Sequence, residues 1–266
     1  MSWRALSPRA LRPGAWLLLA AAVLTLLALL LPPIAQPPAY HDFADRRACP
    51  GLPGLLPNCL DTASNVLFVL AGLIGLRFLS STAGRRAFRD AREELPYMVF
   101  FLAVILIGIA SAYYHLAPDH ARLAWDRGAM ALAFMAWFAA ILGERLDVTL
   151  ARCLLPLLVA AGLASVTWWL WSETQERGDL RPYLLMQAAP LLLIPLLLWC
   201  TAPRYSRAGD ILAIIGLYVL ALLLDYGDRA MFSASRGAIS GHTLKHAVAA
   251  LAAYGVVRHL RLRRAV

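Results

Sequence analysis

Long apolar runs separated by short polar segments dominate the chain. Each run is long enough to cross about 30 Å of hydrocarbon as a helix, which takes about 20 residues. Helices are expected because lipid offers no hydrogen-bond partner to an exposed backbone group. The pattern predicts eight membrane-spanning helices, near residues 15–34, 62–80, 96–116, 123–143, 152–172, 183–201, 209–226 and 239–259. Pro156, Pro190 and Pro195 fall inside two of these runs and predict kinks there.

The first apolar run follows three arginines, as the apolar core of a secretory signal peptide does. These are Arg4, Arg9 and Arg12. The run is longer than a usual cleaved core, and the sequence near Ala35 is a poor cleavage site. We therefore expect residues 15–34 to be retained as a helix.

The composition is typical of an integral membrane protein and excludes a water-soluble globule. Hydrophobic residues make up 61% of the chain and charged residues only 15%. The net charge is +9, but all of the 25 basic residues except Lys245 are arginines, and they lie between apolar runs without forming one patch. A nucleic-acid-binding surface is therefore not expected, and nothing in the sequence indicates a protein partner.

The arginines between the runs predict how the chain is oriented in the membrane. Cytoplasmic loops carry an excess of Lys and Arg. With an even number of spans and the N-terminus inside, sixteen basic residues fall on the cytoplasmic side and eight on the other, while Lys245 falls within the last run. The pattern thus predicts that both termini are cytoplasmic, and the basic inner face suits anionic lipids.

The four cysteines divide between the two sides of the predicted membrane. Cys49 and Cys59 fall in the first external loop, where an oxidising compartment would permit a disulfide. Spacing alone does not decide whether this bond forms, because a disulfide needs specific geometry. Cys153 and Cys200 fall at cytoplasmic helix ends and are expected to be free, and no cysteine spacing typical of a metal site occurs.

Polar residues gather where five of the predicted helices meet the external side. An ionisable group within a membrane span is costly, so it marks a candidate functional site. Ser111 and His115 are four residues apart and share a helix face, as do His242 and His246. The full set is Asp61, Ser64, Asn65, Ser111, His115, Asp126, Asp225, Asp228, His242 and His246. Their common position predicts that they form a single site.

The histidines in this set have the spacing of metal ligands. Two histidines at positions i and i+4 can bind one cation from one helix face, and a third from another helix leaves a fourth position for water. His242, His246 and His115 meet this requirement. Zinc bound in this way lowers the pKa of its water to about 7. Asp126 would then take the water's proton, and Ser111 would donate a hydrogen bond to the developing oxyanion.

Each of these residues also has a purely structural interpretation. A single histidine near the membrane interface is commonly a hydrogen-bonded helix-end residue, and Ser111 could pack between helices. Asp126 could form an interfacial ion pair with Arg127. The metal site is favoured by the whole set, because three histidines, a serine and an aspartate lie on one side of a chain that has only six histidines.

These motifs resemble those of the alkaline ceramidase family. That family belongs to a membrane hydrolase superfamily that also includes the adiponectin-receptor-like proteins and the GPI-lipid remodelling hydrolases. The resemblance is carried by Ser111-x-x-x-His115, by Asp126 eleven residues later, and by His242-x-x-x-His246 in the last run. The segment Asp61-Thr-Ala-Ser64-Asn65 is similar to the Asn-x-x-Ser-Asn that begins the first core helix of the family, with Asp61 replacing the first Asn. Tyr40-His-Asp-Phe-Ala-Asp45-Arg46 and Ser240-Gly-His-Thr-Leu-Lys-His246 resemble the bacterial branch, and the resemblance covers roughly residues 40 to 260.

The resemblance implies an all-α membrane bundle with a seven-helix core in residues 37–260. Residues 1–36 would add a cytoplasmic segment and an extra helix, and residues 261–266 a basic cytoplasmic tail. His115, His242 and His246 would bind zinc, Asp126 would transfer protons, and Ser111 would stabilise the oxyanion. Ser64, Asn65, Asp225 and Asp228 would orient the ligands. The implied reaction is hydrolysis of the amide of a ceramide-like membrane lipid, to a fatty acid and a sphingoid base or amine.

Besides Asp61, two further departures from the family qualify this implication. Family members from eukaryotes also bind calcium through acidic residues before the first core helix, and the oxygen donors in the comparable region here are Asp42, Asp45, Asn58 and Asp61. The loop between these donors differs from that of the family, since it contains arginines and prolines. The alternative to a calcium site is therefore that these acidic residues are solvated loop charges. Lys245 falls between two expected ligands but on a different face, and is expected to reach outward or to pair with Asp225 or Asp228.

Three functions from different classes remain open from the sequence. The first is a zinc amidase acting on N-acyl lipids at the external leaflet of a bacterial inner membrane, since the near absence of Lys suggests a GC-rich bacterial genome. The second is a haem or quinone electron carrier, which would need histidines at matched depth on both sides. The third is a non-catalytic receptor or transporter that retains the metal site.

Overall fold

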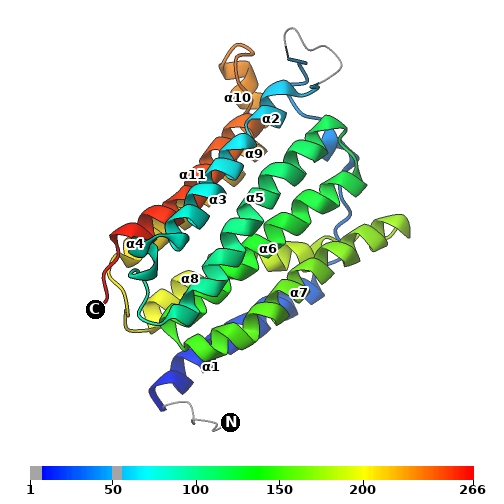
Figure 1. The fold of residues 1–266 in the computed structure, drawn as a ribbon. Helices are drawn as coiled ribbons and strands as arrows, with labels where there is room; N and C mark the ends of the chain where they lie inside the picture. Colours follow the sequence, from blue (N-terminus) through cyan, green and yellow to red (C-terminus); the bar gives the residue numbers. More distant parts are fainter. Residues whose placement is uncertain (1–7, 50–55) are drawn as a thin grey trace.

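The computed structural model describes residues 8–49 and 56–266, which form a bundle of helices (Figure 1). Apart from an isolated bridge between Tyr205 and Ala265, these residues contain no β-structure, so the all-α prediction is confirmed. The long helices are α1 (Pro8–Leu30), α3 (Val66–Ser80), α5 (Glu94–Leu116), α6 (His120–Arg145), α7 (Val148–Thr174), α8 (Arg181–Cys200), α9 (Ala208–Tyr226) and α11 (Gly241–Leu262). Shorter elements connect them, namely η1 (Pro38–His41), α2 (Cys59–Ala63), α4 (Thr82–Arg85), η2 (Ala91–Glu93) and α10 (Asp228–Ala234).

Six helical segments of the described chain are long and apolar enough to cross a membrane, and they mark an integral membrane protein. They are Cys59–Ser80, Ala91–Leu116, His120–Arg145, Val148–Thr174, Arg181–Cys200 and Ala208–Tyr226. The other two predicted spans correspond to α1, whose described apolar stretch is the shorter Gly14–Leu30, and to α11. α11 is long but carries His242, Lys245 and Arg258. The crossing of these two helices stays a prediction, and Arg4 of the topology count lies outside the described residues.

Polar caps move the starts of α6 and α7 outward from the apolar runs. The side chain of Asp119 accepts a hydrogen bond from the backbone of Arg122, and that of Asp147 accepts one from Leu150. Each bond satisfies a free N–H group of the first turn, so α6 and α7 begin three or four residues before the predicted starts. The three prolines lie inside α7 and α8, which are continuous through them.

α6 lies at the centre of the bundle. It packs between α5 and α7, while α11 packs between α3 and α9. Every residue from Met135 to Arg145 is buried. Several are Ala or Gly, and small side chains let membrane helices approach closely.

α3 and α5 pack at very close range because glycine is present on both. A Cβ atom at Gly108 would lie 2.8 Å from the backbone oxygen of Asn65, and one at Gly72 would lie 2.7 Å from that of Phe101. Any larger residue would push the two helices apart. The close contact brings the start of α3 beside the end of α5, which carries His115.

A buried ionic cluster holds the far end of α11 in place. Arg263 donates a hydrogen bond to Glu144 of α6, and Tyr97 of α5 donates to the same carboxylate oxygen at 2.5 Å. The Arg263 guanidinium also lies 4.0 Å from the ring centroid of Tyr205. Breaking a buried ion pair strands a charge, so this cluster fixes α11 against α5 and α6.

A disulfide joins the loop before α2 to the first residue of that helix. Cys49 and Cys59 are bonded, with their Cα atoms 4.9 Å apart. This separation lies in the range that disulfides require. Cys153 and Cys200 are free, as predicted.

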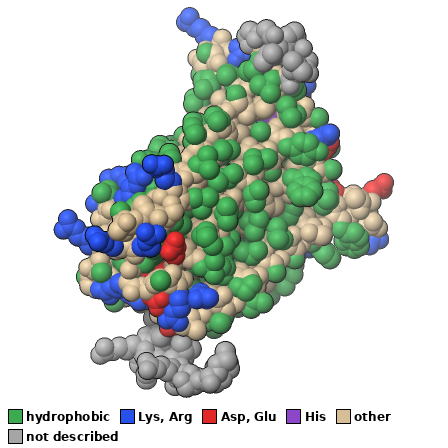
Figure 2. Space-filling model, in the orientation of Figure 1, with side chains coloured by type: hydrophobic (Ala, Val, Ile, Leu, Met, Phe, Trp, Pro, Cys, Tyr) green, Lys and Arg blue, Asp and Glu red, His purple; other side chains and the backbone are tan. Residues whose placement is uncertain are grey.

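The surface agrees with a lipid environment. Figure 2 shows hydrophobic side chains over the broad middle of the molecule, with most of the visible Lys and Arg side chains gathered toward one end. Leu73, Leu102, Ile109, Leu157 and Leu223 are among the large apolar residues that are exposed on the surface of the molecule. Lipid tails would cover such residues without cost, whereas water would not. Which end faces the cytoplasm stays a prediction.

Candidate metal centre

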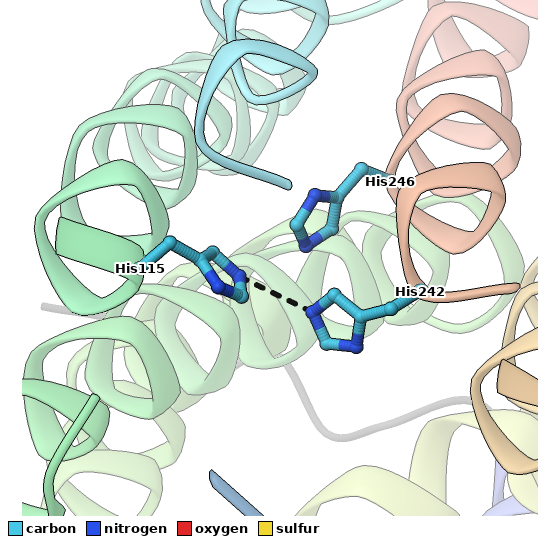
Figure 3. A group of neighbouring side chains, drawn as sticks. All are labelled: His115, His242 and His246. Atoms are coloured by element: carbon cyan, nitrogen blue, oxygen red, sulfur yellow. Dashed lines mark hydrogen bonds between the residues drawn. The ribbon is translucent and has the colours of Figure 1, made fainter. Parts of the chain in front are cut away.

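Three buried histidines converge near the end of the bundle where α2 and α10 lie (Figures 1 and 3). His115 comes from the last turn of α5, and His242 and His246 come from the first turns of α11. One nitrogen atom of each lies within 4.8 Å of those of the other two. Nε2 of His115 and Nε2 of His242 are 3.2 Å apart. The predicted three-histidine cluster is therefore confirmed.

Neighbouring side chains fix the orientation of two of the imidazoles. Nδ1 of His242 lies 2.7 Å from Oδ1 of Asp225, and a carboxylate accepts the hydrogen bond. Nδ1 of His246 lies 2.8 Å from Oγ of Ser64, whose own proton is donated to the backbone oxygen of Asp61. His246 is then the donor to Ser64. In both rings the remaining nitrogen, Nε2, is left with a free lone pair.

The spacing and chemistry of the cluster fit a divalent transition metal such as zinc. Two nitrogens bound tetrahedrally to zinc at about 2.0–2.1 Å lie about 3.3 Å apart. The distance between Nε2 of His115 and Nε2 of His242 is close to this value. Hydrogen-bonded Nδ1 atoms are also typical of histidines that bind metal through Nε2. The three histidines could therefore hold a metal ion.

The start of α11 is built to place His242 beside Asp225. Ser240 caps the helix by accepting a hydrogen bond from the backbone of Thr243. A Cβ at Gly241 would lie 2.2 Å from the backbone oxygen of Leu224, so only glycine allows α11 to begin this close to α9. Asp228, expected to orient a ligand ring, instead accepts a hydrogen bond from the backbone N–H of His242 at 2.8 Å. It therefore positions the helix and touches no imidazole nitrogen.

The short helix α2 supports the same end of α11. Oδ1 of Asp61 accepts hydrogen bonds from Thr243 at 2.5 Å and from Ser240 at 3.3 Å. Asn58 donates from its side chain to the backbone oxygen of His115 at 2.8 Å. Asn65 donates to the backbone oxygen of Asp61 at 2.7 Å, at the break between α2 and α3. These contacts hold both helices that carry the histidines.

Ser111 and Asp126 line one cavity together with His246 (380 Å³). Ser111 is buried one turn before His115 on α5, and Asp126 lies near the start of α6. Oδ1 of Asp126 is buried and has no hydrogen-bond partner among the residues that the structure describes. The structure thus brings both expected catalytic residues to the same space as one of the ligands, while their roles stay proposals.

Of the ionisable side chains near the site, Lys245 has an acidic partner, whereas Asp126 forms no ion pair with Arg127. Nζ of Lys245 lies 3.2 Å from Oδ1 of Asp225, so the predicted pairing is confirmed and the ammonium is neutralised beside the cluster. The alternative ion pair of Asp126 with Arg127 does not form, because the Arg127 guanidinium donates to Gln36 instead.

The expected calcium ligands have separate partners. Asp42 forms ion pairs with Arg46 and Arg229, and Asp45 accepts two hydrogen bonds from the guanidinium of Arg47, at 2.7 and 2.8 Å. The bonds from Arg47 hold the pKa of Asp45 below its ordinary value. The other two expected ligands bond to α5 and α11, as described above. This arrangement favours the alternative interpretation, loop charges held by arginines, over a shared calcium ion.

Phe43 is a part of the site that sequence reasoning missed. Its ring centroid lies 4.7 Å from that of His115 and 4.5 Å from that of His242, and its side chain is buried. The ring covers the two imidazoles on the side of the loop before α2. No periodicity marks a single aromatic residue in a loop, so only its place in the segment Tyr40–Arg46 could have drawn attention to it.

A hydrogen-bonded chain of side chains also lies next to the cluster. Nδ1 of His41 lies 2.8 Å from the hydroxyl of Tyr114, and Nε2 of His41 lies 2.7 Å from Nδ1 of His120. Burial, together with the neighbouring His120, lowers the pKa of His41, so the neutral ring is favoured. These hydrogen bonds connect η1 to α5 and α6 beside the site.

Replacing Asp225 by Asn is expected to weaken metal binding about 10- to 100-fold, the usual cost of losing a partner that orients a ligand. Asn keeps the shape but removes the negative charge that faces both His242 and Lys245. The measurement is a competition titration of zinc against a fluorescent chelator. Asp210→Asn, at the other end of α9, is the matched control and should bind as the wild type does. Equal affinity of Asp225→Asn and the wild type would contradict the orienting role.

Comparison with known proteins adds no relative: no family model, curated protein or solved structure matches the chain. The chemistry of the site must therefore be argued from its own geometry.

Proposed function

We propose that the protein is a zinc-dependent intramembrane amidase, similar to alkaline ceramidases, which hydrolyses the amide bond of ceramide-like N-acyl lipids. The products would be a fatty acid and a sphingoid base or amine. One observation carries the proposal. Three buried imidazoles converge beside a cavity, and Ser111 and Asp126 lie on the wall of this cavity together with His246. The motif resemblance supports the same reaction.

The cavity suits a substrate with one polar group and a long apolar chain. Ser111, Asp126, Asp225, Lys245 and His246 lie on its wall. Much of the remaining wall is apolar and comes from α3, α5, α6, α8, α9 and α11, including Phe100, Val104, Trp137, Ile214 and Val256. Pockets of about 300–1,000 Å³ with a few polar groups are typical of small-molecule sites. An acyl chain among the apolar residues would leave its amide beside the histidines.

The residues have distinct roles in the proposed reaction. His115, His242 and His246 would hold zinc, which when bound supplies an electrophile and lowers the pKa of water at its open position. Asp126 takes a proton from the attacking water and returns it to the amide nitrogen as the C–N bond breaks. Ser111 donates a hydrogen bond to the carbonyl oxygen as this oxygen gains negative charge. The oxygen of water ends on the fatty acid, and its protons are shared between the products.

The proposed location follows from the charge pattern. The site would face the external leaflet of a bacterial inner membrane, with both termini in the cytoplasm. A lipid substrate would reach the cavity without leaving the membrane.

Metal analysis combined with a substrate panel tests the proposal. Purified protein is expected to contain about one zinc ion per chain and to release fatty acid from at least one member of a panel of ceramides and N-acyl amino lipids. Bound zinc without cleavage of any amide in the panel would instead favour a non-catalytic receptor or transporter. Absorption bands of haem would favour an electron carrier.

A further inference from the structure

Arg127 is a buried guanidinium on the wall of the cavity. It follows Asp126 on α6 and is only 5% exposed. Its guanidinium carbon lies 4.1 Å from the ring centroid of Trp169, 4.9 Å from that of Tyr183 and 5.4 Å from that of Tyr40. These rings come from three separate elements. Their faces attract the cation and hold the guanidinium in one orientation.

The charge of Arg127 has no acidic partner in the described parts of the chain. Its Nη2 donates to the side-chain oxygen of Gln36, which is neutral, and its Nη1 has no hydrogen-bond partner. No carboxylate among residues 8–49 and 56–266 forms an ion pair with it. Burying a charge without an opposite charge is costly, so its retention inside a membrane bundle marks a functional group.

The second cation on the cavity wall behaves differently. Lys245 lies 3.2 Å from Asp225 and is neutralised by it. Arg127 therefore has a positive charge that no carboxylate of the described chain compensates and an N–H donor that is not used. The charge of Lys245 is compensated by Asp225.

Arg127 lies where the polar end of a bound lipid could reach it. Gln36, Pro37 and Tyr40, which precede α2, line the cavity beside it. Asp126, the proposed proton carrier, is its neighbour in the chain. With the acyl chain among the apolar residues and the amide at the histidines, the amine side of the substrate would extend toward this segment.

We infer that Arg127 binds a carboxylate on the amine side of the substrate amide, so that the preferred substrates are anionic N-acyl amino acids. This inference rests on the proposed amidase function and narrows its substrate class. A guanidinium forms strong, charge-assisted hydrogen bonds with a carboxylate. A neutral headgroup would leave the charge of Arg127 unpaired, whereas a carboxylate would neutralise it.

Two substrates of nearly equal size test the inference. N-oleoylglycine carries a carboxylate where N-oleoylethanolamine carries a hydroxyl group. The wild type is expected to cleave N-oleoylglycine with a kcat/KM about 10- to 100-fold higher, as expected for one hydrogen bond to a charged group. Arg127→Gln should lose this preference through a higher KM for N-oleoylglycine, with little change for N-oleoylethanolamine. Arg127→Lys should restore part of it, and Arg122→Gln, which replaces a half-buried arginine on the same helix that does not line the cavity, should behave as the wild type.

The outcomes separate this inference from the proposed function. Equal use of the two substrates by the wild type, or an equal loss for both in Arg127→Gln, would overturn the inference and leave the amidase in place. If neither lipid is cleaved, the affinities of both lipids for zinc-loaded protein can still be compared by the thermal stabilisation that each produces. Tighter binding of N-oleoylglycine to the wild type than to Arg127→Gln would then show that Arg127 selects the carboxylate. If Arg127→Gln fails to accumulate as folded protein, the preference of the wild type decides alone.

Discussion

His242→Ala protein is expected to lose both its metal and its amidase activity. The substitution removes one of three convergent nitrogens and leaves only His115 and His246. Two imidazoles cannot complete the three-ligand set that an open zinc site uses. Metal analysis after dialysis against metal-free buffer should show a fall from about one zinc ion per chain to nearly none. Fatty-acid release from the best lipid of the panel should fall to background.

His120→Ala is the matched control for this experiment. His120 lies at the same end of the bundle, but its ring packs against His41 and Trp169 outside the cluster. This variant should keep its zinc, so a loss specific to His242→Ala identifies a ligand. Full zinc content in His242→Ala would show that the metal, if present, is held elsewhere.

Asp126→Asn is expected to separate metal binding from catalysis. Asn has nearly the same shape as Asp but cannot accept a proton, so kcat should fall about 10²- to 10⁴-fold, the usual contribution of general acid–base catalysis. The zinc content should stay at that of the wild type, because Asp126 is not among the three clustered ligands. Steady-state kinetics and metal analysis on the same preparation measure both quantities.

Asp119→Asn provides the comparison for Asp126→Asn. Asp119 caps the same helix and pairs with Arg122, and it does not line the cavity. Its replacement should leave kcat close to that of the wild type. An unchanged kcat in Asp126→Asn would remove this residue from the mechanism, and a loss of zinc would make it a ligand instead.

Much of the bundle could be predicted from the sequence because its signals are local. Six of the eight predicted spans correspond to helical segments with the required length and apolar character. Helical spacing also placed His242 and His246 on one face, and Ser111 one turn before His115. α1 and α11 are not among these segments, because the described apolar stretch of α1 is short and α11 carries the charged and polar residues of the site.

Some neighbours of the site were predicted with the wrong contact or missed. Asp225 does hold a ligand ring, whereas Asp228 binds the backbone of the helix that carries it. The calcium expectation assigned one role to four residues that have separate partners in the folded chain. Asp42 and Asp45 pair with arginines, Asp61 accepts from two hydroxyl groups, and the amide nitrogen of Asn58 donates to a backbone carbonyl. Phe43 and the aromatic faces around Arg127 have no periodic sequence signal, because they come from the segment before α2 and from helices far apart in the chain.

The sequence by itself determined the helical class, the membrane environment and the pairs of residues that share a helix face, because each of these depends on residues within a few turns of one another. Only the tertiary structure decided that His115 meets His242 and His246, since these residues are joined through the packing of α3 against α5 and of α11 against α3 and α9. That packing depends on Gly108 and Gly241, where a side chain would collide with a neighbouring backbone. The same contacts decided which carboxylate orients a ring, which caps a helix and which stays unpaired, because hydrogen-bond partners are set by distances that spacing along the chain does not contain.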